Sequence, residues 1–450
     1  MIIVGKSVLD QTTNESHFNS FFTIDNLKRV YEKNIAHSTS SGLDNVSHEA
    51  FLKKIESELD IISNKVMSDR YRFTKYKLKL ISKGRAKAPR EISIPTIRDR
   101  ITLRCLCDYL GEIFKDKIKH VLPQKIIHSV VSAVPLYDGF IKLDVENFYP
   151  SIRHDILKSI LETKLPTSAV NLIMSSITTP TVSFSSNQDV PAILGVPQGT
   201  SISNVLAHIY LNCVDEKYAS SKEYKYYRYV DDILVLCNRH ECHALAENII
   251  HNFKSLGLKI HEVSHKSEKS TVGSMSDTFS YLGYSFDNGT ISARQSSIKN
   301  LKNSLASIFT SYKYSREKRI EYLQWRLHLR ITGCIYDKKC KGWLFFFSEM
   351  NDLSSLYILD SYVRKLLVRY QTDIYVPSFG KCLHEIQHNR YQSKTIINYD
   401  SFNIFDMRYF LTNVFDYDLS ETSDRKVEFL FHKKLRRETS ELLVDIQSFS

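Results

Sequence analysis

The stretch Tyr227–Leu236, which reads YRYVDDILVL, constrains the fold of this 450-residue chain more than any other. Two adjacent carboxylates, Asp231 and Asp232, interrupt a run of apolar residues. An unpaired buried charge costs several kcal/mol, and neighbouring side chains of a regular strand point to opposite faces. We therefore predict a tight β-hairpin whose tip presents both carboxylates to a cation.

A third carboxylate has a similar context, because Asp144 stands at the end of the apolar segment 139–145, GFIKLDV. If this segment and the hairpin are neighbouring strands, Asp144 meets Asp231 and Asp232. Such a cluster suits hard divalent cations, and two Mg²⁺ ions about 3.5–4 Å apart can clamp an in-line phosphoryl transfer. The sequence thus predicts three catalytic carboxylates and two Mg²⁺ ions; a surface turn with two acids is the alternative interpretation.

Charge and composition narrow the class of partner. The chain has 61 Lys and Arg against 50 Asp and Glu, a net charge of +11, which favours a polyanion such as nucleic acid, with an anionic membrane as the alternative. No apolar run approaches ~18 residues, and the first residues lack the pattern of a signal peptide. The eight cysteines show no secreted framework. We expect a cytoplasmic protein with free thiols and no membrane partner.

The pattern along the chain indicates an α+β fold. Residues 1–69 read as helical, and the basic segment 70–100 alternates as strands do, with a turn near Gly84 and Pro89. Strand and helix patterns then alternate up to about residue 290. One helix is expected after Pro150, and another after residues 195–200. Helical spacing dominates from 291 to 450.

Four motifs occur in order: Leu143–Ile152, Gly195–Ser203 with Pro-Gln-Gly, Tyr229–Asp232, and Phe279–Tyr284. The ordered set resembles the reverse transcriptases over about residues 70–290. In style it is most similar to the bacterial enzymes of group II introns, retrons and phage defence. The basic stretch Pro89–Arg100 is similar to their fingers region.

The resemblance implies a right-hand polymerase with fingers and palm, built from an antiparallel sheet plus helices, and a helical thumb and C-terminal domain. The expected domains are an N-terminal helical extension at 1–69, fingers and palm at 70–290, and the thumb and C-terminal domain at 291–450. The implied enzyme is an RNA-directed DNA polymerase, a nucleotidyltransferase. Its implied metal ligands are Asp144, Val145, Asp231 and Asp232.

The resemblance also implies which residues contact the incoming nucleotide. Tyr149 would pack under its sugar, where a bulky ring leaves no room for a 2′-hydroxyl. Gln198 would hydrogen-bond near it, while Gly199 lets the backbone approach closely. Arg90 and Lys83 would grip the triphosphate.

Two further functions follow from the resemblance. Lys266 or Lys269 would protonate the leaving pyrophosphate, since a lysine is protonated at neutral pH; the choice between them stays open. Tyr281, Leu282 and Gly283 would form the primer grip. Tyr149, Gln198 and Lys83 have alternative interpretations as an ordinary core aromatic, a polar loop residue and a solvated surface charge.

The expected function is synthesis of cDNA in phage defence, on an RNA template that is a noncoding RNA, with dNTPs as substrates and DNA as product. A template-independent or protein-primed polymerase of abortive-infection type is the first alternative. A catalytically silent nucleic-acid-binding scaffold is the second, and it is disfavoured by the intact Asp144, Asp231 and Asp232. A homo-oligomer is left open.

Overall fold

The computed structural model describes residues 8–36, 38, 40–82, 88–118, 121–184, 186, 189–265, 267–442 and 446. The chain divides into two compact units. The first comprises Met1–His120 with Ile141–Val272, and the second comprises Val121–Phe140 with Gly273–Ser450. We describe each unit by itself.

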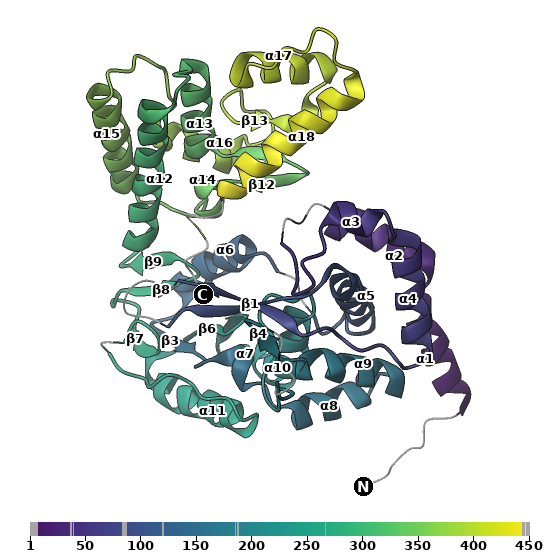
Figure 1. Ribbon diagram of the computed structural model, residues 1–450. Coiled ribbons are helices and arrows are strands. Elements are labelled where there is room, and N and C mark those ends of the chain that lie inside the picture. Colours follow the sequence, from purple (N-terminus) through teal and green to yellow (C-terminus); the bar gives the residue numbers. More distant parts are fainter. Residues whose placement is uncertain are drawn as a thin grey trace. The chain divides into compact units, whose positions relative to one another are not determined.

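The first unit begins with helices, as the sequence predicts. They are α1 (Val8–Ser20), α2 (Ile24–Val30), α3 (His48–Leu52) and α4 (Ile55–Met67), drawn in purple in Figure 1. The expected basic hairpin follows as β1 (Tyr76–Ile81) and β2 (Arg90–Ile94), which pair antiparallel, with the short β4 (Thr181–Val182) parallel to β1. Gly84, in the expected turn, lies outside the described residues.

The remaining elements of this unit surround a four-stranded sheet of order β5-β6-β3-β7. Its strands are β3 (Gly139–Asp144), β5 (Lys225–Tyr229), β6 (Asp232–Cys237) and β7 (Thr271–Ser274). The helices of this part are α5 (Ile97–Ile113), α7 (Phe148–Ser151), α8 (His154–Glu162), α9 (Thr167–Thr178), α10 (Ser203–Ala219) and α11 (Cys242–Ser255). All six residues of β3 are buried, so the segment that ends in Asp144 is a central strand.

The helix expected after Pro150 differs from the prediction, because it is split into α7 and α8. Ile152 and Arg153 between them are extended. The Ile152 carbonyl accepts a hydrogen bond of 2.8 Å from the Gly195 N–H, and Arg153 bridges to Leu194. Pairing with the loop that carries Pro-Gln-Gly thus takes these residues out of the helix.

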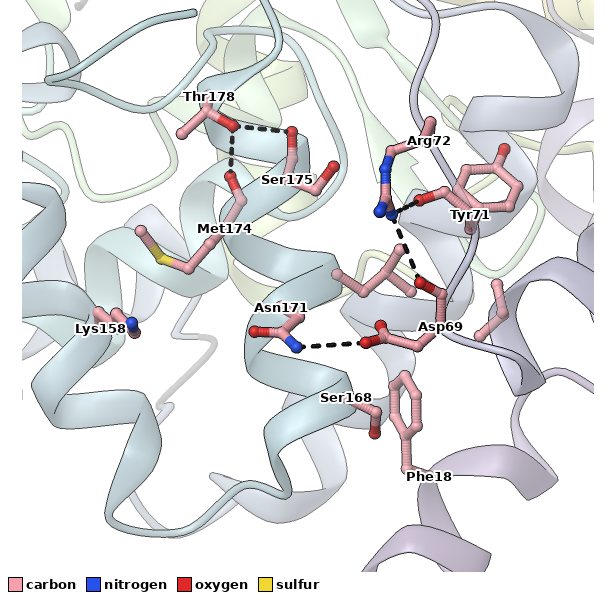
Figure 2. Close-up of a pocket in the computed structure, with 12 residues that line it drawn as sticks. Phe18, Asp69, Tyr71, Arg72, Lys158, Ser168, Asn171, Met174, Ser175 and Thr178 are labelled. Atoms are coloured by element: carbon pink, nitrogen blue, oxygen red, sulfur yellow. Dashed lines mark hydrogen bonds between the residues drawn. The ribbon is translucent and has the colours of Figure 1, made fainter.

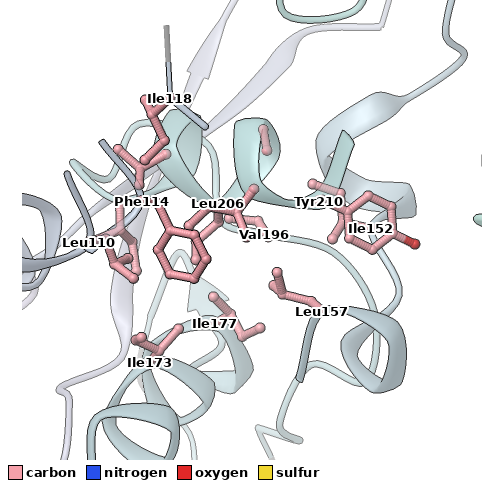
Figure 3. Close-up of a cluster of buried hydrophobic side chains, with 14 of the residues drawn as sticks. Leu110, Phe114, Ile118, Ile152, Leu157, Ile173, Ile177, Val196, Leu206 and Tyr210 are labelled. Carbon is pink, nitrogen blue, oxygen red and sulfur yellow. The ribbon is translucent and has the colours of Figure 1, made fainter. Parts of the chain in front are cut away.

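A continuous apolar core supports the sheet and this loop. Figure 3 shows Phe114, which follows the end of α5, with Ile177 of α9 and Leu206 of α10 within one cluster. Ile152 and Val196, from the two paired segments, are buried in the same core. Because close-packed interiors resist displacement, this packing fixes both segments against the helices.

A cavity of about 420 Å³ lies between the N-terminal helices and α9 in the first unit. Figure 2 shows Asn171 of α9 directed at Asp69, with 3.3 Å between the amide nitrogen and the carboxylate oxygen. Arg72 donates to the Tyr71 carbonyl nearby, at 2.9 Å. Residues 8–69 therefore pack onto the same body as the sheet.

The second unit is mainly helical, with α6 (Pro123–Ala133) from the earlier part of the chain. Its other helices are α12 (Gln295–Tyr314), α13 (Ile320–Thr332), α14 (Trp343–Phe346), α15 (Leu353–Arg369), α16 (Phe379–His388), α17 (Ile404–Phe415) and α18 (Asp424–Glu441). Two small sheets complete it. One contains β8 (Phe279–Tyr281), β9 (Tyr284–Asp287) and β10 (Thr290–Ala293); the other contains β11 (Cys334–Tyr336), β12 (Lys339–Lys341) and β13 (Ile397–Asn398).

The predicted α+β class is confirmed. Among the described residues, no helix is both long and apolar enough to span a membrane.

Candidate active site

The predicted hairpin is present at Tyr227–Leu236. Strands β5 and β6 pair antiparallel with Tyr229 opposite Asp232, so Val230 and Asp231 form a two-residue turn. Val230 has a φ of 58°, a conformation that β-branched residues avoid. Backbone strain of this kind costs about 1–3 kcal/mol and occurs often at functional sites. The turn is thus held in place by its surroundings.

Asp144 and Asp231 come together because β3 and β6 are neighbouring strands. The Val145 N–H donates to the Asp231 carbonyl at 3.3 Å, which ties the strand end to the turn. Burial raises the pKa of Asp231, and the charge of Asp144 raises it further; the charges of Lys269 and Arg90 act in the opposite direction. These two carboxylates and two cations therefore share one electrostatic environment.

Asp144 is held by cationic neighbours. Its Oδ2 lies 2.9 Å from Lys269 Nζ and 3.3 Å from His261 Nε2. The other imidazole nitrogen of His261 lies 3.5 Å from Glu146 Oε1, and Lys259 pairs with Glu146 at 3.0 Å. Sequence reasoning did not identify His261 or Glu146. His261 lacked a signal because its site depends on the isolated bridge between Val145 and Ile260.

The set of predicted metal ligands is only partly assembled. Asp232 begins β6 and is half-buried, whereas Asp231 occupies the turn. Across the described parts of the chain, no three His, Cys, Asp or Glu side chains are grouped closely enough to hold a metal ion. The structure brings together Asp144, Val145 and Asp231, and the participation of Asp232 stays a prediction.

The Pro-Gln-Gly loop packs against both the fingers hairpin and the segment that carries Tyr149. The Gln198 carbonyl accepts a hydrogen bond of 2.7 Å from the Ser93 N–H of β2. The Val196 N–H donates to the Tyr149 carbonyl at 2.8 Å. Gly199 has a φ of 96°, and a Cβ there would lie 2.6 Å from Ile92 Cγ2. This close approach requires glycine and fixes the loop beside β2.

Tyr149 is half-buried, and its hydroxyl donates a hydrogen bond to Oδ1 of Asn204 in α10. Burial raises the pKa of Tyr149, with a further increase from the charge of Asp231. The phenol is therefore neutral and lies near the β5–β6 turn. Asn204 follows the Pro-Gln-Gly motif, and its part in orienting the ring was not predicted.

Arg90 is the first residue of β2, opposite Ile81. Its positive charge lowers the pKa of both Tyr149 and Asp231, against the raising effect of burial, which is the larger of the two. Arg90 therefore faces the region where a triphosphate is expected. Lys83 and Lys266 lie outside the described residues, so Lys269 is the candidate general acid whose position is known.

Tyr281, Leu282 and Gly283 belong to the second unit, where Tyr281 ends β8 and the other two residues connect β8 to β9. Tyr281 is fully buried and pairs with Tyr284. Leu282 and Gly283 have φ values of 44° and 83°, as a two-residue turn requires. Their role as primer grip stays a prediction.

A buried ionic network beside the β5–β6 turn was also missed. Arg228 of β5 has a side chain only 4% exposed and forms an ion pair with Asp215 of α10. Its Nη1 donates to the Val230 carbonyl at 2.8 Å, and Tyr226 donates to Asp215 at 3.2 Å. Nη2 of Arg228 also lies 3.4 Å from Nδ1 of His208. The available sequence signal was Arg228 itself, a cation three residues before Asp231.

Similarity to known proteins covers the region that contains these motifs. The family described as reverse transcriptase (RNA-dependent DNA polymerase) matches residues 81–286. Protein YkfC of Escherichia coli (strain K12) is 22% identical over 299 residues, which cover 54% of this chain and 74% of the relative.

Two solved structures of telomerase are similar to this chain. Apo telomerase from Candida tropicalis, truncated from the C-terminal domain, has a TM-score of 0.39 at 14% identity, covering 49% of this chain and 55% of that one. Telomerase from Candida albicans, in complex with a TWJ fragment of telomeric RNA, has a TM-score of 0.39 at 13% identity, covering 87% and 66%.

The family match covers β2, β3, the Pro-Gln-Gly loop and the β5–β6 hairpin, and it confirms the predicted right-hand polymerase fold for this region. The chain therefore carries a reverse transcriptase domain at residues 81–286, and its enzyme class is that of the RNA-directed DNA polymerases, which are nucleotidyltransferases.

Proposed function

We propose that the chain makes DNA on an RNA template by metal-dependent nucleotidyl transfer. The observation that carries this proposal is the meeting of Asp144, at the end of β3, with Asp231 in the β5–β6 turn. Two partly buried carboxylates of this kind repel each other, as the raised pKa of Asp231 reflects, after the larger effect of its burial. A cation between them removes this repulsion.

Hard oxygen ligands fit Mg²⁺, so Asp144, Asp231 and the Val145 carbonyl, with Asp232, are the proposed ligands of two ions. Bound there, the ions would activate the attacking 3′-hydroxyl and neutralise charge on the triphosphate. Nζ of Lys269 lies 2.9 Å from Oδ2 of Asp144, at the edge of the proposed site. From this position its ammonium would act as the general acid for pyrophosphate.

The other residues of the site bind and select the nucleotide. Arg90 would bind the triphosphate, as guanidinium groups do bidentately, and Lys83 would assist it. Tyr149 would exclude a 2′-hydroxyl by steric contact, with its hydroxyl anchored on Asn204. Gln198 would lie near the base or sugar, because its backbone is fixed on Ser93.

The biological setting is a finer proposal, supported by the resemblance of the motifs to bacterial defence enzymes. The chain would act in the cytoplasm during phage infection and copy a noncoding RNA partner. Residues 1–69, 70–290 and 291–450 would serve as extension, fingers and palm, and thumb with C-terminal domain, and Tyr281–Gly283 would grip the primer. Untemplated or protein-primed synthesis is the second candidate, since it uses the same carboxylates.

The test is to purify the chain from its host and sequence the bound nucleic acid. The protein then receives Mg²⁺ and four dNTPs, and the product is sequenced. A cDNA that matches a bound RNA supports templated copying. A homopolymer, a random product or a product covalently attached to the protein supports the second candidate.

The control is Asp231→Ala with Asp232→Ala, which should abolish synthesis and leave the fold intact. Glu56→Ala with Asp60→Ala, which removes two exposed acids from α4, should retain synthesis. Undiminished synthesis by the first variant would exclude the proposed site. Absence of product from the wild type would favour the scaffold interpretation.

A further inference from the structure

Helix α18 (Asp424–Glu441) carries an outer face that is almost entirely cationic. The exposed basic residues of the helix are Arg425, Lys426, Lys433, Arg436 and Arg437. Positions 426, 429, 433, 437 and 440 recur at intervals of three or four residues and so share one face, with 425 and 436 beside them. At a rise of 1.5 Å per residue, the five cations span about 18 Å.

The acidic residues of α18 do not neutralise this face. Asp424 pairs with Arg408 at 2.7 Å, and Arg326 lies 3.4 Å from Glu438 and 2.9 Å from Glu441. Glu428 lies on the flank, within electrostatic range of His432. The helix thus directs three of its four carboxylates to arginines of its own unit. Lys426, Lys433 and Arg437 are exposed, whereas Lys434 packs over the rings of Phe415 and Tyr417.

The apolar face of α18 is buried within its own unit. Val427, Phe431 and Leu435 are fully buried in the core of the second unit, where α18 packs beside α17 (Figure 1). A helix that lies on a membrane needs a free apolar face, and α18 has none. Phe429 alone is an exposed large apolar side chain there, 63% exposed, with Lys433 Nζ 5.8 Å from its ring centroid.

We infer that the outer face of α18 binds the phosphate backbone of an RNA stem. A row of Lys and Arg without intervening acids matches the regular negative charge of a nucleic-acid strand. Such a contact is independent of base sequence and positions the RNA. This inference rests on the proposed function, since an enzyme that copies RNA must retain it through the reaction. The surface would anchor the RNA apart from the residues that perform chemistry.

The test uses fluorescence anisotropy with a labelled RNA stem-loop of about 16 base pairs, a length known to suit a protein that reads duplex shape. The variant is Lys426→Gln, Lys433→Gln and Arg437→Gln in the full chain. Each lost phosphate contact should reduce the slope of log K against log salt by nearly 1, so we expect the three substitutions together to make the slope smaller by about 2.7. Affinity at about 0.1 M salt should fall more than tenfold.

Two matched variants distinguish the effect of where the charges are removed from the effect of charge loss itself. Lys33→Gln, Lys54→Gln and Lys65→Gln remove the same charge from exposed positions near the N-terminus and should retain the wild-type slope. Lys426→Arg with Lys433→Arg keeps both charges and should retain the wild-type affinity for RNA. An unchanged slope for the α18 variant would overturn the inference. Tighter binding of a DNA hairpin of the same sequence, with the same loss in the variant, would overturn the assignment to RNA.

Two further outcomes also decide against RNA. Binding to vesicles rich in phosphatidylserine, lost in the α18 variant while RNA binding is retained, would identify a lipid surface. Binding of an acidic protein, lost in the α18 variant while RNA binding is retained, would identify a protein as the partner of this surface. Extension of a primed RNA by the wild type tests the polymerase separately. If the wild type copies RNA and the variant binds RNA normally, only the α18 inference fails; if synthesis is absent and the variant loses RNA, only the proposed polymerase function fails.

Discussion

The guanidinium of Arg228 donates a hydrogen bond of 2.8 Å to the carbonyl oxygen of Val230, the first residue of the β5–β6 turn. The same guanidinium is paired with Asp215 and almost fully buried. The link joins α10 to the backbone that carries Asp231. Arg228 is therefore a positioning residue, which acts on the site through the turn.

Arg228→Lys should reduce kcat by about 10–100-fold, the usual effect of losing a residue that orients a metal ligand. Lysine keeps the charge opposite Asp215 and loses the second branch that reaches Val230, so KM for dNTP should change little. Steady-state kinetics over a range of Mg²⁺ concentration measures both. Arg70→Lys, at an exposed position, is the control. An unaltered kcat would show that the turn holds its shape without this bond.

Asn204→Ala should weaken discrimination against ribonucleotides, because the Tyr149 hydroxyl loses its partner and the ring gains freedom. Tyr149→Ala should weaken it more, since the steric barrier itself is removed. Tyr149→Phe in the Asn204→Ala background separates the bond from the ring. The ratio of kcat/KM for dNTP and rNTP is the measurement. Identical ratios in wild type and Tyr149→Ala would remove Tyr149 from the selection of the sugar.

Gly199→Ala should impair the enzyme, because its φ of 96° is unfavourable for alanine and its Cβ would lie 2.6 Å from Ile92 Cγ2. We expect a loss of about 1–3 kcal/mol in the free energy of unfolding and a higher KM for dNTP, as Gln198 shifts from β2. Gly111→Ala in α5 is the matched control. No atom lies within 4 Å of its added Cβ, so it should be stabilising by about 0.5–1 kcal/mol. Equal effects of the two substitutions would contradict the steric explanation.

Asp99 predicts a pH dependence of stability. Burial raises its pKa from 3.8 to about 6, against hydrogen bonds from Thr96, Tyr71 and Thr74 that lower it. The ionised form is thus less favourable in the folded than in the unfolded chain. Its contribution to stability is present below pH 3.8 and is lost as pH rises through about 6.

Relative to Asp99→Asn, the wild type should therefore lose roughly 2 kcal/mol of unfolding free energy between about pH 4 and 7. Denaturant titrations of both proteins at several pH values give this difference. Asp60→Asn, on the exposed side of α4, is the control. A wild-type advantage that grows with pH would have the wrong sign for this account.

The hairpin and its neighbour strand could be predicted because short-range patterns determine them. Apolar runs on both sides of Asp231 and Asp232 allow one compact arrangement, a turn between paired strands. The strand that ends in Asp144 is uniformly apolar, as a central strand must be. The sequence pattern does not determine that this strand lies beside β6, so the meeting of Asp144 with Asp231 could be predicted only on that assumption.

The contacts that complete the site depend on residues distant in sequence. Lys269 and Asp144 are 125 positions apart, and Asn204 and Tyr149 are 55 apart. No periodicity relates such pairs. The first pair meets because β7, which follows Lys269, lies beside β3 in the sheet, and the second meets because α10 packs beside the segment that carries Tyr149. The strands β11, β12 and β13 were missed for another reason: with two or three residues each, they are too short to show alternation.

The two-residue turn between β5 and β6 has a consequence for how such a chain can change. Side chains alternate with a period of two, so a shift of one residue in the register of β6 would exchange its two faces. Each buried side chain from Ile233 to Cys237 would then occupy a position shaped for its neighbour, and Asp231 would leave Asp144. Evolution of this turn is therefore limited to amino-acid substitutions. Insertions and deletions in relatives are expected in other loops.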